Sequence, residues 1–401
     1  MKRIIAVCAF VCAASIGLSD YSAAIGASQL PWHPNSILID PAISRRQGHS
    51  IDVSGNLAIV GAYGNSGGHA LIFDLATGTL LHRLRGNDVV SGDLFGFSVA
   101  IDGNLAIVGS GQNAAAYVFD ATTGTQLRIL RPSTSAFVRT VDINNGIAIL
   151  GTPSADPGGP TNSGAGAITV YNANTGTQLR RINGPGGFNL NFGSALAIEG
   201  NTLAVSSPAN FGNGEFRVFD AATGQLQWSY GYLEDGRDFR ARDIVIDGDL
   251  IAVGVTRNTT KISDVLLFDR HNGDLIRRID VNVNATDDYM SSIAMSGGRI
   301  AVGVWGYSID GIGFAGAVHL FDASSGDHLA TIENPDPQFS DNFGYDVSLS
   351  GQRLLVGASG DVSERGTTYV YMIPEPGSLA LAFAGCALVY GVRRSRYSIA
   401  A

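Results

Sequence analysis

The chain has 401 residues, of which 45% are hydrophobic and only 15% are charged, and its formal net charge is −9. A chain of this composition can bury a large core, and the acidic balance argues against a nucleic-acid partner, which needs a dense basic face. Glycine contributes 52 residues, but the glycines do not recur at every third position, which excludes a collagen-like helix.

The first 27 residues have the order of a secretory signal peptide. Lys2 and Arg3 precede an apolar run over residues 4–18, and Ser22-Ala23-Ala24 offers a cleavage site of small residues. We therefore expect residues 1–27 to direct export, with an uncleaved anchor as the alternative. The apolar run is short for a membrane-spanning helix, which favours the signal peptide.

One pattern then recurs seven times along the body of the chain. It is clearest in FGFSVAIDGNLAIVGSGQNAAAYVFDATTGTQLRIL (95–130) and in FGSALAIEGNTLAVSSPANFGNGEFRVFDAATGQLQW (192–228). Each copy leads to an aromatic residue, and the spacing between these residues is close to 50. They are Phe73, Phe119, Tyr171, Phe219, Phe268, Phe321 and Tyr371. A period of this length is typical of repeat architectures.

One unit reads as four strands. SVAI alternates between apolar and polar residues, LAIVG is the continuous apolar run of a strand covered on both sides, and AAYVFD and QLRIL follow. Asp102-Gly103-Asn104 predicts a tight hairpin turn between the first two strands. In the turn between the last two, Asp120 can cap the turn and Gly124 can take a positive φ.

Seven such units predict an all-β fold, a seven-bladed β-propeller of four-stranded antiparallel blades over residues 28–372. The seventh unit ends at Tyr371 without a fourth strand, while NSILID (35–40) stands alone before the first unit. We therefore predict that Ser36–Ile39 completes the last blade. This closure removes the sheet edges that an open array would expose.

The pattern FGxSVAxDG…VG…YVF resembles the FG-GAP repeat family, whose propeller also occurs in integrin α-chains. The resemblance covers about residues 47–371, and the Phe-Gly pair is kept at Phe95, Phe192 and Phe343. It implies the propeller fold but no particular activity. The calcium loops of integrin-like members have shrunk here to turns such as Asp-Gly-Asn, which cannot wrap an ion. We therefore expect no calcium site and no cofactor.

The sequence contains no recognisable catalytic motif. The seven histidines show no metal-binding spacing, no nucleophile elbow is present, and all three cysteines lie in the terminal segments. The sequence cannot show whether two carboxylates meet across the propeller. If carboxylates converge at the ring centre, they would favour a carbohydrate-active enzyme. FDAATGQLQW (219–228) resembles the repeats of quinone-dependent dehydrogenases, but only Trp228 ends a unit in this way.

The loops between the second and third strands are the longest, and we expect them to open on the face that also carries the links between blades. Aromatic rings among their flexible polar residues are suited to stacking on a sugar or a peptide. The alternative is that each ring folds back onto its own hairpin. The candidate ligand-binding residues are Tyr63, Phe211, Trp305, Tyr307 and Phe314.

The last segment, residues 373–401, has its own order. Pro374-Glu375-Pro376 precedes the apolar stretch Ser378–Val392, and Arg393, Arg394 and Arg396 follow it. This order resembles the PEP-CTERM sorting signal of Gram-negative bacteria. The resemblance implies a transmembrane helix that anchors the chain transiently in the inner membrane, recognition by an exosortase-type enzyme, and delivery to the outer surface or extracellular matrix. Apolar helices are thus expected at both ends of the chain.

Three functions fit these features. The first is an exported, non-enzymatic propeller that binds extracellular polysaccharide or a surface protein through its loop face. The second is an extracellular enzyme, carbohydrate-active or quinone-dependent. The third is a purely structural component of the cell surface that needs no ligand.

Overall fold

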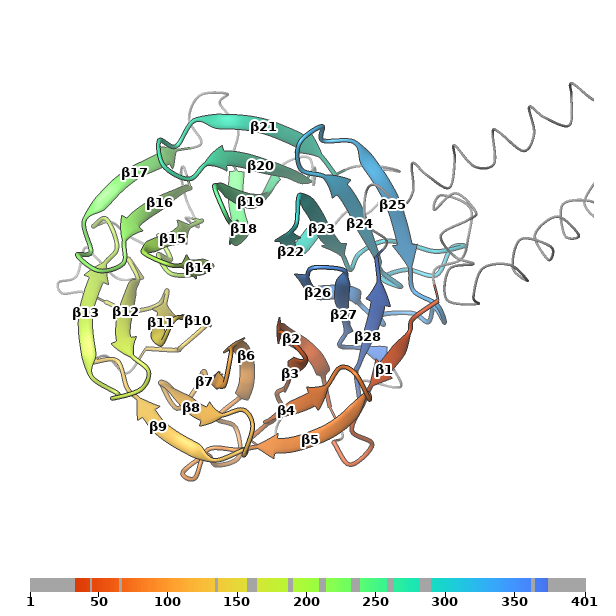
Figure 1. Ribbon diagram of the computed structural model, residues 1–401, viewed down its shortest axis with the longest axis horizontal. Helices are drawn as coiled ribbons and strands as arrows, with labels where there is room; N and C mark the ends of the chain where they lie inside the picture. Colours follow the sequence, from red (N-terminus) through yellow and green to blue (C-terminus); the bar gives the residue numbers. More distant parts are fainter. Residues whose placement is uncertain are drawn as a thin grey trace, which may run out of the picture.

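The computed structural model describes residues 33–43, 45–64, 67–133, 136–156, 164–186, 190–208, 214–231, 239–257, 263–281, 290–361 and 365–373. These residues form seven four-stranded antiparallel sheets arranged as blades around a common axis (Figure 1). The predicted all-β, seven-bladed propeller is confirmed.

Each blade contributes one strand to each of four concentric positions. The innermost strands are β2 (Gln47–Ser54), β6 (Phe95–Asp102), β10 (Thr140–Asn144), β14 (Leu196–Glu199), β18 (Phe239–Asp247), β22 (Met290–Ser296) and β26 (Phe343–Ser350). The second strands are β3 (Leu57–Ala62), β7 (Leu105–Ser110), β11 (Ile147–Thr152), β15 (Thr202–Ser207), β19 (Leu250–Arg257), β23 (Arg299–Val304) and β27 (Arg353–Ala358). The third strands are β4 (His69–Asp74), β8 (Ala115–Asp120), β12 (Ala167–Asn172), β16 (Glu215–Asp220), β20 (Ser263–Asp269), β24 (Ala317–Asp322) and β28 (Thr367–Met372). The outermost strands are β5 (Thr79–Leu84), β9 (Gln126–Leu130), β13 (Gln178–Asn183), β17 (Leu226–Gly231), β21 (Leu275–Asp280), β25 (His328–Glu333) and β1 (Ser36–Leu38).

The apolar pattern of the repeat follows from these positions. In β7 every residue after Leu105 is buried, and in β8 every residue before Asp120 is buried, because neighbouring blades cover both faces of these strands. The outer strand β5 instead alternates between exposed and half-buried residues over most of its length. The cores therefore lie between adjacent blades and form a continuous ring.

The N-terminal strand closes the ring, as predicted. In β1, Ser36, Ile37 and Leu38 pair antiparallel with Val370, Tyr369 and Thr368 of β28. The Leu38 side chain is fully buried. Asp40, just beyond β1, forms an ion pair with Arg83 of the first blade. The joint therefore combines backbone pairing, apolar packing and one ion pair.

The Phe-Gly pair of the repeat is an inter-blade contact. Phe95 is fully buried and forms a parallel bridge with Gly68 of the preceding blade. The next residue, Gly96, has a φ of 85°, and a Cβ atom there would lie 2.1 Å from the carbonyl oxygen of His69. Only glycine allows this approach. In the first blade Gln47 takes the place of the phenylalanine and bridges Gly366.

The turns between third and outer strands have the predicted geometry. In the second blade, Asp120 Oδ1 accepts the backbone N–H groups of Thr122 at 2.8 Å and Thr123 at 3.0 Å. Gly124 has a φ of 72° and lies under the His82 ring of the preceding blade. The turn thus also contributes to packing between blades.

Several predicted features lie outside the described residues. They are the signal peptide at residues 1–27, both terminal apolar helices, and the motif residues Pro374, Glu375, Pro376, Arg393, Arg394 and Arg396. Within the described part of the chain, no helix is long and apolar enough to cross a membrane.

Candidate functional site at the mouth of the central channel

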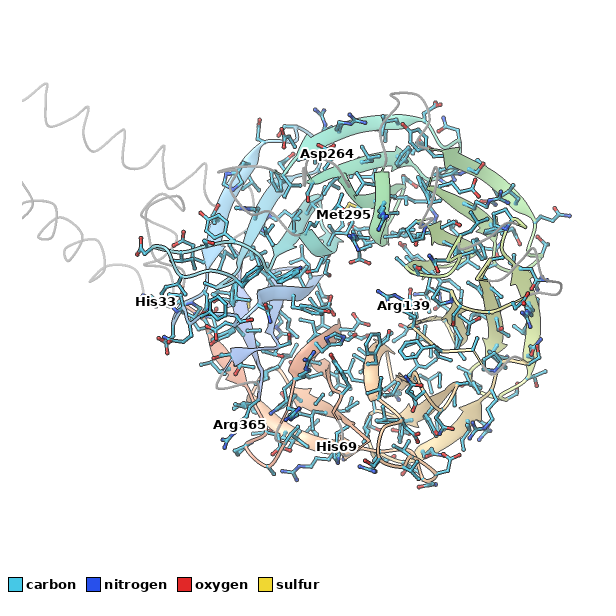
Figure 2. The ribbon with its side chains drawn as sticks, turned by 180° about the vertical axis from the view of Figure 1, so that it is seen from behind. His33, His69, Arg139, Asp264, Met295 and Arg365 are labelled. Carbon is cyan, nitrogen blue, oxygen red and sulfur yellow. The ribbon has the colours of Figure 1, made fainter. Side chains whose placement is uncertain are left out.

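The seven innermost strands enclose a central cavity of about 1060 Å³. The opening persists when side chains are drawn, and Arg139 lies at its edge (Figure 2). All seven innermost strands start on the face that carries the inter-blade links and the loops between second and third strands. We call this end of the channel the mouth.

One residue from every blade lines the mouth. This residue stands near the start of the inner strand, one position before the residue that faces the last part of the second strand. At this point five of the seven inner strands have a register shift. Such bulges re-aim side chains, here toward the cavity. We call these residues the rim residues: His49, Phe97, Arg139, Ser194, Arg242, Ser291 and Tyr345.

Aromatic rings form one side of the mouth. The His49 ring lies 4.7 Å from that of Tyr345 and 4.9 Å from that of Phe97, and these three residues come from adjacent blades. Tyr63 packs 4.4 Å from His49 and 5.3 Å from Phe97. The pKa of His49 is lowered to about 3, first by burial and then by Arg46 and Arg139. The ring is therefore neutral at physiological pH.

Trp305 extends this aromatic wall along the sixth blade. Its ring lies 6.3 Å from Tyr345 and stacks on Phe314 at 5.5 Å, with 21° between the planes. Of the candidates named from the sequence, Trp305 lines the cavity, while Tyr63 packs against His49 and Phe314 against Trp305. Tyr307 does not join them, because its ring packs against His319 at 5.8 Å. Phe211 lies outside the described residues.

Arginines form the other side of the mouth. Arg139 and Arg242 are rim residues of the third and fifth blades, and both are exposed. Within the described chain, the Arg139 guanidinium has no hydrogen bond or ion pair, and Arg242 donates only from Nε to Thr256 Oγ1 at 2.9 Å. The pKa of Arg242 is lowered by burial and then by the positive charges of Arg240 and Arg139. The mouth is therefore cationic in a chain of net charge −9.

Carboxyl groups line the channel below the mouth. Asp142 is representative: Oδ1 accepts the N–H of Ile143 at 2.7 Å, and Oδ2 accepts that of Ile198 in the next blade at 2.8 Å. Burial raises the pKa of this carboxyl to about 7. The same pair of bonds, with the pKa raised by burial to about 6, 6 and 7, recurs at Asp52, Asp243 and Asp346.

Serine makes the same inter-blade bond at positions equivalent to Asp243 and Asp346. Ser98 Oγ accepts the N–H of Val141 at 3.0 Å, and Ser50 Oγ accepts that of Val99 at 3.0 Å. These side chains satisfy backbone N–H groups on the free inner edge of the following strand, groups that would otherwise lack a protein partner. A hydroxyl thus replaces the carboxyls of Asp243 and Asp346 without loss of this bond, while Asp52 and Asp142, two residues further along their strands, hold a second N–H group of the next blade. We therefore assign the channel carboxyls primarily a structural role.

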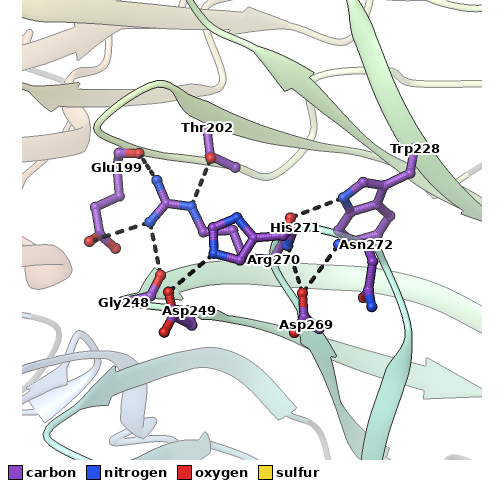
Figure 3. A network of polar contacts seen from close by, with 9 residues as sticks. All are labelled: Glu199, Thr202, Trp228, Gly248, Asp249, Asp269, Arg270, His271 and Asn272. Carbon is purple, nitrogen blue, oxygen red and sulfur yellow. Dashed lines mark hydrogen bonds and ion pairs between the residues drawn. The ribbon is translucent and has the colours of Figure 1, made fainter.

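On the opposite face of the propeller, polar contacts join the fourth and fifth blades (Figure 3). Arg270 donates to Thr202 Oγ1 at 2.7 Å and to the Gly248 carbonyl at 2.8 Å, and it lies 3.6 Å from the Glu199 carboxylate. Trp228 donates Nε1–H to the Arg270 carbonyl at 3.0 Å and packs against Gly273. Trp228 thus serves as an inter-blade contact.

Most rim residues could not be predicted from the sequence, because they belong to no long loop, histidine pattern or catalytic motif. Phe97 and Arg242 lie within β6 and β18, and Arg139 directly precedes β10, so none of the three lies in a long loop. Aligning the seven units would have placed them in one column directly before the SVAI strand. Their shared direction toward the axis, however, depends on the bulge and on ring closure.

Comparisons with known proteins agree with the repeat and the fold. Residues 79–119 and 327–371 match the family described as FG-GAP repeat. Residues 150–346 match the family described as outer membrane protein assembly factor BamB. No curated protein matches the chain. The chain therefore carries FG-GAP repeats, together with repeats similar to those of BamB.

Solved structures share the fold at low sequence identity. One is from Kuenenia stuttgartiensis hydrazine synthase, with a TM-score of 0.60 and 14% identity over 85% of this chain and 99% of that one. Another is the Cps50 (Swd1) β-propeller domain of Myceliophteria thermophila, with a TM-score of 0.59 and 13% identity over 86% of this chain and 100% of the domain. At such identities the likeness concerns the propeller alone.

Proposed function

We propose that this protein is an exported, non-enzymatic binding module whose channel mouth holds a glycan. The observation that carries the proposal is the aromatic wall of Phe97, Tyr345 and Trp305, which borders a cavity of about 1060 Å³. Ligand sites are typically concave, with aromatic walls and a few polar groups. The rings are held by edge-to-face and stacked contacts, so little side-chain entropy is lost when a sugar covers them.

A glycan fits this mouth better than a peptide strand. Extended peptides commonly bind sheets by adding to a free strand edge. Here the inner edges are occupied, because side chains such as Ser98 and Asp142 accept the N–H groups of the next blade. Recognition at the mouth must therefore use ring faces and side-chain donors.

The proposed address is the cell surface or extracellular matrix. It is supported by the signal-like residues 1–27 and by the Pro-Glu-Pro and arginine motif of residues 373–401, which resembles a PEP-CTERM signal read by an exosortase-type enzyme. The match of residues 150–346 to an outer membrane protein assembly factor is in keeping with a place in the cell envelope.

The channel carboxyls favour a second candidate, a glycan-cleaving enzyme. Asp142 and Asp346, whose pKa values burial raises to about 7, resemble the general acids of glycosidases in this respect. We rank this candidate second because both oxygens of each carboxyl already accept backbone N–H groups.

The test is binding of the purified chain to the producer's extracellular polysaccharide and to oligosaccharides derived from it, measured by calorimetry. We expect binding that Phe97→Ala and Trp305→Ala each weaken, and that Ile276→Ala, on the exposed outer strand β21, leaves unchanged. Chromatography of the same mixtures detects cleavage. Products that disappear in Asp142→Asn would establish the enzyme instead, and no binding to any glycan would refute the proposal and leave a structural role.

A further inference from the structure

We infer that the glycan bound at the mouth is acidic, and that Arg139 and Arg242 bind its anionic groups. This inference rests on the proposed glycan-binding function and deepens it. The two arginines come from the third and fifth blades, line the same cavity as the aromatic wall, and leave most of their donors unused within the described chain.

The charges around the two arginines differ in sign from those around Asp142, and among the described rim residues only Tyr345 is influenced by both kinds, by Arg139 and Arg46 and by Asp346. The charges that perturb Arg242 and His49 are Arg46, Arg139 and Arg240, all of them positive. The charges that perturb Asp142, in contrast, are those of Asp52 and Asp102. No ion pair links Arg139 or Arg242 to a carboxylate in the described part of the chain. An anion is therefore attracted to the mouth and repelled from the channel interior.

Like charges close to Arg242 carry an electrostatic cost that a bound anion relieves. The depressed pKa of Arg242 reflects this cost, since burial and two neighbouring guanidinium groups disfavour its charged form. A carboxylate or sulfate neutralises the cluster, and the planar guanidinium can bind either group with two parallel hydrogen bonds.

The order of rim residues indicates how an acidic sugar chain would lie. Tyr345, His49 and Phe97 occupy blades seven, one and two, whereas Arg139 and Arg242 occupy blades three and five with Ser194 between them. An oligosaccharide crossing the mouth would stack one residue on the rings and place its acidic group near the arginines. Ser194 Oγ donates to the Asn191 carbonyl at 2.8 Å, so its oxygen can accept a hydrogen bond from a sugar hydroxyl between them.

The experiment compares oligogalacturonate with its methyl ester, which keeps the sugar chain and removes the charge, and includes neutral dextran and dextran sulfate. We expect the free acid to bind at least tenfold more tightly than its ester, in a salt-dependent manner. Arg139→Gln and Arg242→Gln should each weaken binding of the acid by about tenfold or more, without affecting the ester. Arg128→Gln, on the outer strand β9, is the matched control, and circular dichroism checks that each variant is folded.

The outcomes separate the two claims. Equal binding of acid and ester, with loss only in Phe97→Ala, would overturn the acidic ligand and leave the glycan module intact. Stronger binding to dextran sulfate that depends on the same arginines would support the inference and assign sulfate as the anion. No binding to any of the four glycans, but arginine-dependent binding to a poly-glutamate peptide, would overturn both claims.

Discussion

The substitution Gly96→Ala tests the meaning of the Phe-Gly pair most directly. A Cβ atom at this position would lie 2.1 Å from the His69 carbonyl oxygen and 3.1 Å from the Ala62 backbone nitrogen, both in the preceding blade. Because carbon–oxygen contacts in proteins rarely fall below about 3 Å, the two blades would have to separate by about 0.9 Å. The φ of 85° is also unfavourable for alanine.

The expected loss combines two terms. A left-handed conformation costs alanine about 1–2 kcal/mol, and forcing an extra methyl group into a packed site typically costs about 1–3 kcal/mol more. We therefore expect Gly96→Ala to lower the free energy of unfolding by about 3 kcal/mol. Urea unfolding, followed by circular dichroism and tryptophan fluorescence, measures this loss.

Gly92→Ala is the matched control, since Gly92 has a φ of 92° but no atom within 4 Å of the added Cβ. It should lose only the backbone term of about 1–2 kcal/mol. If the two variants lost the same free energy within about 0.5 kcal/mol, the Phe-Gly pair would not owe its glycine to the neighbouring blade, and our account of the repeat would be wrong.

Two further predictions concern the closure and the channel. Leu38→Ala should destabilise the ring by about 2–5 kcal/mol because Leu38 is fully buried, whereas Ile37→Ala, at a side chain 51% exposed, should have little effect in the same urea experiment. The pKa of Asp142 is about 7 in the folded chain, against the ordinary 3.8 of an unfolded chain. Between these two pH values the folded chain binds more protons than the unfolded chain, so the free energy of unfolding falls as the pH rises from about 4 to about 7. Asp142→Asn should make stability less dependent on pH between about 4 and 7, and an unchanged pH profile would contradict the raised pKa.

The fold could be predicted because it is encoded locally and repeatedly. The run LAIVG must be covered on both faces, and it became β7, buried after its first residue. The isolated NSILID strand and the missing fourth strand of the seventh unit together predicted that the N-terminal strand completes the last blade. The pairing of Ser36 with Val370 confirms this prediction. Local strand and turn chemistry was enough, because each blade repeats the same contacts with its neighbours.

The mouth could be predicted only in part, because it is assembled across blades. Tyr63, Trp305 and Phe314 were named because aromatic residues in polar loops are visible in one segment. Tyr307 lies in the same loop as Trp305 and Phe314. This loop folds back on itself where Ile309 pairs with Ile312, and the Tyr307 ring packs against His319. The direction of a ring within a loop depends on such tertiary contacts, which the sequence does not reveal.

Variation among the seven copies is itself a signal about where binding occurs. Two columns of the repeat lie next to each other on the inner strands. In one, Ser50, Ser98, Ser292, Asp243 and Asp346 supply oxygen atoms to the N–H groups of the following blade, so their chemistry is confined to small acceptors. In the adjacent rim column no such bond is required, and the residues range from phenylalanine to arginine. A position freed from holding the ring together can vary between blades, and five kinds of side chain among the seven rim residues create the asymmetry that recognition of a specific ligand needs.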